Sequence, residues 1–257
     1  MDYMKRDPAR RADAGRSLPS ARSVIALAVN YHHPEDPRPE SPAGKVAQYA
    51  YGRDYHRVLE KKLKRLSRFV VEQAGPGTET RYYVDTGPLL ERAFAREAGL
   101  GFFGKNTNLI TREYGSWVFL ACLVTNLELE FDAPDAGSCG SCTLCLEACP
   151  TSAILEGHRV DATRCISYWT IEAKELAPPG LRAKFGEWAF GCDVCQEVCP
   201  YNFREKTTQH EELYPQKKAG TWIDLENIKV EPGSPLKRSK TLTGRGPRYG
   251  ISNATIR

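Results

Sequence analysis

Eight of the nine cysteines of this 257-residue chain fall between residues 139 and 199, most of them in two runs that each end at a proline. The runs are Cys139-x2-Cys142-x2-Cys145-x3-Cys149-Pro150 and Cys192-x2-Cys195-x3-Cys199-Pro200, with Cys165 between them. No apolar run is long enough to cross a bilayer, and the charged N-terminus lacks a secretory-type apolar core, so we expect a cytoplasmic protein. Because that compartment disfavours disulfides, the clustering favours a metal site.

The spacing within the runs distinguishes two kinds of metal site. Structural zinc is usually held by separated Cys-x2-Cys pairs, often with histidine, and neither run contains a histidine. The x2-x2-x3-Pro run is the ferredoxin pattern for [4Fe–4S] clusters, in which the fourth cysteine ligates the other cluster. We therefore assign four ligands to each of two clusters: Cys139, Cys142, Cys145 and Cys199 to cluster 1, and Cys149, Cys165, Cys192 and Cys195 to cluster 2. Such clusters pass single electrons to an acceptor, which we expect in the other part of the chain.

Strand and helix patterns alternate before the cysteines. We predict buried strands over 23–31, 81–86 and 117–126, the last with Cys122 as a small buried residue. Apolar spacing predicts a helix from about residue 54 that stops at Gly75, and a second helix capped by Thr86, with Pro88 in its first turn and Gly99 after its end. The elements indicate an α/β or α+β fold.

Composition divides the chain into three predicted parts. Residues 1–134 would form the α/β domain, residues 135–205 a ferredoxin-like domain for two clusters, and residues 206–257 a basic C-terminal segment. The stretch from Ser234 to Gly250 carries five cations and no acid. Such a run is typical of a solvated tail, or of an arm that contacts nucleic-acid phosphates.

The glycines Gly99, Gly101 and Gly104, followed by Lys105 and Asn106, imitate two nucleotide-binding motifs. Both motifs require a strand before the glycines and a helix after them, whereas here a helix is expected first. Asn106 also stands where a P-loop needs serine or threonine. We expect these glycines to end the helix and to allow close approach of a flat ligand.

Five segments occur in an order that resembles the epoxyqueuosine reductase family over nearly the whole chain: VDTGPLLERAFAREAGLGFFGKNTNLI, EYGSWVFLACLVTNLEL, CGSCTLCLEACPTSAI, CISYWTIE and FGCDVCQEVCPYN. The resemblance implies reduction of the epoxide of epoxyqueuosine to the alkene of queuosine at the tRNA wobble position. It implies cobalamin and two [4Fe–4S] clusters, with a cobalamin domain built as a mixed sheet covered by helices, related to flavin reductases. Relatives carry extra N-terminal residues, and some carry a C-terminal helical-repeat domain.

Residue roles follow from the chemistry that the resemblance implies. Removing an epoxide oxygen takes two electrons and two protons; Co(I) cobalamin, a strong nucleophile, would attack the epoxide carbon and the clusters would reload the cobalt. Asp85, after the second strand, matches the family acid and would donate a proton to the oxygen, if burial against the corrin raises its pKa. The alternative is a helix N-cap.

Seven further residues are expected around the corrin. A low-potential cobalt disfavours an axial histidine, so we expect base-off cobalamin and give His56 a pocket or structural role. The other candidates are alternatively ordinary caps or turn residues: Lys105, Asn106, Ser116, Ser167, Thr170 and Gln196.

The expected partners are tRNA and an external low-potential electron donor, without a membrane, and the chain is expected to be a monomer. The basic C-terminal segment, with Lys174, Arg182 and Lys184, would hold anticodon-stem phosphates. Two alternatives remain: a cobalamin-dependent reductive dehalogenase, which usually carries an export signal, and a ferredoxin-type electron-transfer protein. The size of the α/β part before the cysteines disfavours a simple carrier.

Overall fold

The computed structural model describes residues 7–203, 206–217 and 220–226; the basic stretch 234–250 lies outside the described residues. Six α-helices are present there: α1 (Pro8–Ala12), α2 (Tyr55–Ala74), α3 (Glu91–Glu97), α4 (Leu144–Ala148), α5 (Pro179–Arg182) and α6 (Val194–Glu197). The strands are short apart from two: β1 (Ser23–Asn30), β2 (Ala43–Val46), β3 (Thr80–Tyr83), β4 (Phe102–Phe103), β5 (Leu109–Ile110), β6 (Val118–Thr125), β7 (Ile154–Leu155), β8 (Arg159–Val160), β9 (Trp188–Phe190) and β10 (Trp222–Asp224). Two single turns matter for the site: η3 (Gln48–Ala50) and the π-helical η4 (Tyr168–Glu172). None of the described helices is both long and apolar enough to traverse a bilayer.

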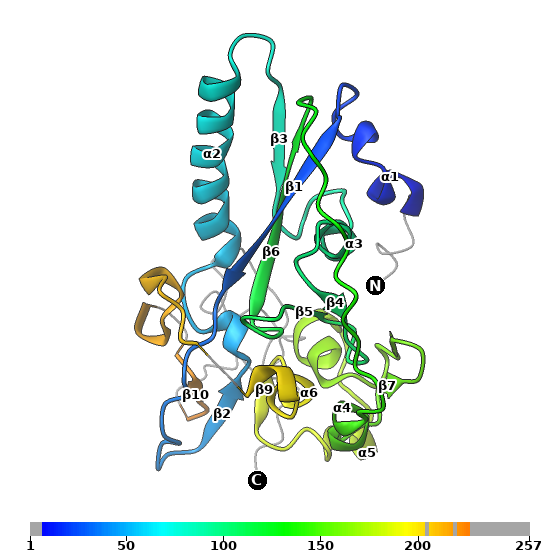
Figure 1. Cartoon of the computed structure of the whole chain (residues 1–257). Coiled ribbons are helices and arrows are strands. Elements are labelled where there is room, and N and C mark those ends of the chain that lie inside the picture. The colour runs from blue at the N-terminus through cyan, green and yellow to red at the C-terminus, as the bar shows by residue number, and fades with distance from the viewer. Residues whose placement is uncertain (1–6, 204–205, 218–219, 227–257) are drawn as a thin grey trace.

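The central sheet has the order β1-β6-β3, and both pairings are antiparallel. α2 packs on one face of this sheet, while α1 and α3 lie on the other side (Figure 1). β6 is the middle strand, so its apolar residues are buried on both faces. Cys122 is fully buried there, which confirms the expectation that it is a core residue.

The long helix α2 follows from its sequence as expected. Leu59 and Leu63, one turn apart, are buried against the sheet, and each such burial stabilises the fold by roughly 1.5–3 kcal/mol. The Asp54 carboxylate accepts a hydrogen bond from the backbone N–H of His56 and caps the first turn. Gly75, with a φ of 83°, follows the last turn.

The second helix begins later than predicted. α3 starts only at Glu91, with Leu90 at its N-cap, and the Thr86 hydroxyl donates to the carbonyl oxygen of Val84 instead of capping a helix. The reason is local: Gly87 packs so closely on the Tyr83 ring that an added Cβ would lie 2.4 Å from Tyr83 Cδ1, and the chain turns there. The end of the helix was predicted correctly, because Gly99 has a φ of 71° and follows α3.

A short hairpin follows the glycines. β4 and β5 pair as antiparallel strands after Gly101, and the turn between them contains Lys105 and Asn106. An added Cβ at Gly101 would lie 2.2 Å from the Ile110 carbonyl oxygen, so the residue serves close backbone packing. No helix follows the glycines, and the nucleotide-binding motifs are excluded as expected.

A second sheet, of order β10-β2-β9, joins distant parts of the chain. β2 pairs antiparallel with β10 and parallel with β9. These hydrogen bonds cross both predicted domain boundaries, after residues 134 and 205, so the predicted parts share a sheet. The cysteine-bearing helices α4 and α6 pack together at the end of the molecule opposite the free end of α2 (Figure 1).

Candidate active site

A cavity of about 460 Å³ lies where the N-terminal end of α2 meets the cysteine-rich part of the chain. Its larger aromatic and apolar lining residues come from η3, α2, η4 and β9: Tyr49, Tyr55, Tyr168, Ile171 and Phe190. Its functional groups come from three predicted regions: Asp54 and His56, Asp85, and Cys165 with Ser167. The volume is within the range of small-molecule sites, about 300–1,000 Å³, and the aromatic side chains suit a flat ligand.

Asp85 accepts two side-chain hydrogen bonds at this cavity. Its Oδ2 lies 2.8 Å from the Tyr55 hydroxyl and 3.0 Å from His56 Nε2, and His56 Nδ1 lies 2.8 Å from Asp54 Oδ1. The Asp85 side chain is 61% exposed, against 15% for His56 and 7% for Asp54. Asp85 is therefore the member of this hydrogen-bonded series that a bound ligand can reach.

The two carboxylates determine the charge of His56. Burial by itself would lower the pKa of His56, but the hydrogen bonds to Asp85 and Asp54, with the charges of both carboxylates, raise it above the ordinary value. Only the imidazolium form can donate from both ring nitrogens. Burial, and then Asp85, raise the pKa of the Tyr55 hydroxyl, so Tyr55 also stays a hydrogen-bond donor.

A tight turn presents Asp85 to the cavity. Asp85 has a φ of 55°, and the backbone N–H of Thr86 donates to the Val84 carbonyl oxygen at 2.5 Å. Asp85 is not the N-cap of α3, so the structure contradicts that alternative for its role. The Glu91 carboxyl accepts a hydrogen bond from the backbone N–H of Asp85, which links the turn to the start of α3.

We expect Glu91→Gln to alter how stability depends on pH. Burial raises the pKa of Glu91 to about 7, although backbone hydrogen bonds from Glu91 and Asp85 lower it. The native state therefore holds this proton more tightly than the unfolded chain does, and the carboxyl destabilises the fold as the pH rises from about 4.5 to 7. Glutamine does not titrate, so the variant should gain on the order of 2 kcal/mol relative to wild type between pH 5 and pH 8. Thermal unfolding at both pH values measures this, and an equal difference in Tm at both would contradict it.

Quartet 1, the predicted ligands of cluster 1, lines a small cavity of its own. Lys105 and Asn106 line it too, and they hold its loops: Lys105 Nζ donates to the carbonyl oxygens of Gly140 and Cys142, both at 2.9 Å, and Asn106 Nδ2 donates to that of Cys195 at 3.1 Å. The backbone N–H of Lys105 points to Cys139 Sγ at 3.4 Å. Lys105 and Asn106 thus lie at the cysteine loops and do not line the large cavity.

Quartet 2, the predicted ligands of cluster 2, is also brought together. Burial raises the pKa of Cys192, and the nearby charges of Asp193, Cys165 and Cys149 raise it further. Burial also raises the pKa of Cys195, and the charges of Cys192, Asp193 and Cys165 add to this effect. The thiols of quartet 2 therefore lie near one another, and Cys145 of quartet 1 lies near Cys195 as well. Cys165 also lines the large cavity, so quartet 2 adjoins the site that contains Asp85.

Ser116 and Gln196 form a buried polar network away from the large cavity. Gln196 Nε2 donates to the Ser116 hydroxyl at 3.0 Å and to its carbonyl oxygen at 3.1 Å. Asn202 donates to Ser116 Oγ at 3.0 Å and accepts from the Ser116 backbone N–H at 2.8 Å. Thr170 is buried too: it donates to the Ile166 carbonyl oxygen and accepts from the Gly191 backbone N–H. Of the eight predicted cofactor contacts, Asp85, His56 and Ser167 line the cavity.

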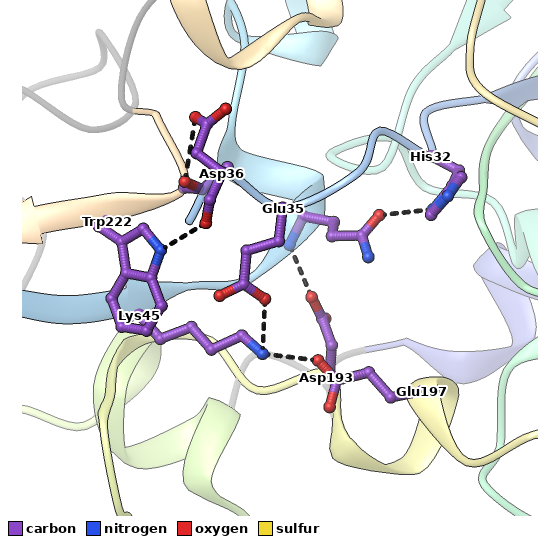
Figure 2. Close-up of polar contacts among 9 residues, drawn as sticks. His32, Glu35, Asp36, Lys45, Asp193, Glu197 and Trp222 are labelled. Carbon is purple, nitrogen blue, oxygen red and sulfur yellow. Dashed lines mark hydrogen bonds and ion pairs between the residues drawn. The ribbon is translucent and has the colours of Figure 1, made fainter. Parts of the chain in front are cut away.

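A second polar network fastens α6 to the N-terminal half of the chain (Figure 2). Lys45 of β2 binds Glu35 at 2.9 Å and Glu197 of α6 at 2.8 Å. The backbone N–H of Gln48 donates to Asp193 Oδ2 at 2.7 Å, and burial raises the pKa of Asp193 to about 7. Asp193 therefore connects the loop of quartet 2 directly to η3, which forms part of the cavity lining.

Two segments of the chain match known protein families. Residues 11–86 match the family described as epoxyqueuosine reductase QueG, DUF1730, and residues 138–202 match a 4Fe-4S double cluster binding domain. An epoxyqueuosine reductase from Synechocystis sp. is 52% identical over 196 residues, which cover 76% of this chain and 68% of that protein. The chain belongs to the epoxyqueuosine reductase family. The family and the 4Fe-4S domain expected from the sequence are thereby confirmed.

Solved epoxyqueuosine reductases share the fold, which confirms the predicted fold class. One, determined with a tRNA-Tyr epoxyqueuosine-modified tRNA stem loop, is 40% identical with a TM-score of 0.76. Another, from Bacillus subtilis, is 38% identical with a TM-score of 0.76, and its catalytic aspartate loop is swung out of the active site. Each comparison covers 82% of this chain and 56% of the solved one, so this chain spans little more than half the length of those epoxyqueuosine reductases.

Proposed function

We propose that this chain reduces epoxyqueuosine to queuosine in tRNA, with cobalamin in the large cavity and a [4Fe–4S] cluster on each cysteine quartet. One observation carries the proposal: Asp85, held by Tyr55 and His56, lines the same cavity as Cys165 of quartet 2. A proposed proton donor and a proposed electron carrier therefore adjoin one site. The tRNA-bound relative supports the choice of substrate.

The described residues fit the proposed groups. Each quartet gathers four thiols from separate stretches of chain, which suits a cubane better than a local two-pair zinc site. The aromatic side chains of the large cavity suit a corrin face. His56 is engaged by carboxylates at both nitrogens, so it is not free to ligate cobalt, which supports a cobalt without an axial histidine.

The hydrogen-bonded series Asp54–His56–Asp85 can supply protons. Cobalamin, when bound, supplies the nucleophile and the two electrons that opening an epoxide to an alkene requires. Release of the oxygen as water also takes two protons. Asp85 is placed to donate the first at the cavity, and His56 Nε2, 3.0 Å away, can replace it because the imidazolium is favoured by both carboxylates.

Asp54→Asn should move the pH dependence of turnover without disturbing the helix. Asparagine is as good an N-cap as aspartate, so α2 should remain intact. Loss of the charge should lower the pKa of His56, and the alkaline limb of the kcat/KM profile should move to lower pH with it. NMR titration of the His56 ring measures the pKa directly. An unchanged profile alongside a lowered His56 pKa would remove His56 from proton supply.

The function itself is tested by anaerobic incubation with epoxyqueuosine-containing tRNA, cobalamin and a strong chemical reductant. Formation of queuosine, detected by mass spectrometry of the nucleosides, is the expected result. The visible spectrum after cobalamin addition separates an enzyme from a ferredoxin-type carrier, because a carrier binds no corrin. Dechlorination of a halogenated substrate without queuosine formation would indicate the dehalogenase alternative. The external donor, the monomeric state and the cytoplasmic location stay predictions.

A further inference from the structure

Five cations form one exposed face of α2, and we call them the basic face: Arg57, Lys61, Lys64, Arg65 and Arg68. Their spacing is i, i+4, i+7, i+8 and i+11. At about 100° per residue, the five positions fall within an arc of about 100°. Leu59 and Leu63 occupy the opposite side of the helix and pack into the core, so the basic face points away from the sheet.

The charges of the basic face are not neutralised within residues 7–203, 206–217 and 220–226, where none of the five forms an ion pair. Three cations elsewhere in that part of the chain, Lys45, Arg112 and Lys206, each lie within 2.7–2.9 Å of a carboxylate oxygen. Like charges at i, i+4 destabilise a helix, and the basic face contains three such pairs, although Glu60 and Glu72 also stand at i, i+4 to Lys64 and Arg68. Because these like charges repel one another, the basic face is better explained by binding of an anionic partner than by a contribution to the stability of the helix.

The basic face starts at the candidate active site. α2 begins at Tyr55, and Arg53, Asp54 and His56 at this end all line the large cavity. With a rise of 1.5 Å per residue, Arg57 and Arg68 are about 16 Å apart along the helix axis. The cations therefore form a track that leads away from the cavity, long enough to follow successive phosphates of a nucleic-acid strand.

We infer that the basic face of α2 binds backbone phosphates of the tRNA substrate while the wobble nucleotide enters the large cavity. The inference rests on the proposed function for the identity of the RNA. Phosphate contacts position a nucleic acid without reading its sequence, which suits an enzyme that must place a modified base in a cavity. This inference does not depend on the predicted C-terminal phosphate-contacting segment.

The test compares two triple variants of the full chain with clusters reconstituted. The first removes three cations of the basic face, Lys61→Gln, Lys64→Gln and Arg68→Gln; glutamine keeps a good helix propensity. The control removes three exposed cations outside α2, Arg10→Gln, Arg16→Gln and Arg96→Gln; the helices of Arg10 and Arg96, α1 and α3, lie across the sheet from α2 (Figure 1). Binding of an epoxyqueuosine-modified tRNA stem loop is measured at several salt concentrations, together with iron content and circular dichroism.

We expect the basic-face variant to lose on the order of tenfold or more in tRNA affinity, and the slope of log K against log salt to fall by about 0.7–0.9 per lost contact. The control should keep wild-type affinity and slope. Equal losses in both variants, or no loss in the basic-face variant with intact helix and clusters, would overturn the inference. If wild type binds the stem loop and forms no queuosine, the proposed function fails and the binding result still decides the role of the basic face.

Discussion

Asp85→Asn is expected to lower turnover of epoxyqueuosine by about 10²–10⁴-fold, the usual range for loss of a general acid. Asparagine has nearly the same shape and tolerates the left-handed backbone that Asp85 adopts, with a φ of 55°. It can still accept a hydrogen bond from the Tyr55 hydroxyl but cannot release a proton to the substrate. Anaerobic single-turnover assays measure the loss, with iron content and the visible spectrum of the bound corrin expected to stay unchanged.

Tyr55→Phe is the matched control for this experiment. It removes one 2.8 Å hydrogen bond to Asp85 and leaves the carboxyl in place. We expect a decrease of about 10–100-fold, since a hydrogen bond to a charged group contributes roughly 1.5–3 kcal/mol. Wild-type turnover in Asp85→Asn would exclude Asp85 as the proton donor, whatever the control shows.

The elements that the sequence predicted correctly are those with local causes. α2 follows from leucines spaced by one turn and from Gly75, and β6 from an uninterrupted apolar stretch with Cys122 in it. Asp85 and His56 line one cavity; the position of Asp85 after a strand and the resemblance both pointed to it, and His56 had been given a pocket or structural role. The composition of both quartets stays a prediction from spacing; the four thiols of quartet 1 line one small cavity.

The parts that were missed depend on contacts between distant segments. Ser116 and Gln196 are 80 residues apart, and only the folded chain joins them through a buried hydrogen bond. A sequence motif indicates that a residue is functionally important, but it does not show which group the residue contacts. Lys105, for example, lies at the cysteine loops rather than in the large cavity. The pairing of β2 with β9 is equally non-local, and no local sequence pattern predicts it.

Three candidate functional residues were not identified from the sequence, because nothing in the residues next to them distinguishes them from ordinary structural residues. Asp54 looks like a helix cap, which it is, and its second bond to His56 appears only in the fold. Glu91 has the pattern of an acid in the first turn of a helix, and its burial beside the Asp85 turn could not be anticipated. Tyr55 sits in the same DYH segment as His56, so that segment was the available signal for both.

Paired cysteine substitutions should reveal that each run lends its fourth cysteine to the other cluster. Cys145 and Cys199 line one cavity, and the nearby Cys199 raises the pKa of Cys145, although they belong to different runs. The double variant Cys145→Ala, Cys199→Ala should therefore lose one cluster and keep about four of about eight irons, with one EPR signal unchanged. In Cys145→Ala, Cys149→Ala, both clusters should lose a ligand, so neither native signal should survive.

An uncrossed arrangement predicts the reverse, because Cys145 and Cys149 would then share a cluster and Cys145 and Cys199 would not. Cys122→Ala is the control for handling and reconstitution, since this thiol is buried in the central sheet and should leave both clusters intact. Turnover should vanish in both double variants, because electrons would have to reach the cavity beside Cys165 through an incomplete relay. The comparison of iron content and EPR therefore decides the ligand assignment, and residual turnover near wild type in either double variant would contradict the proposed electron path.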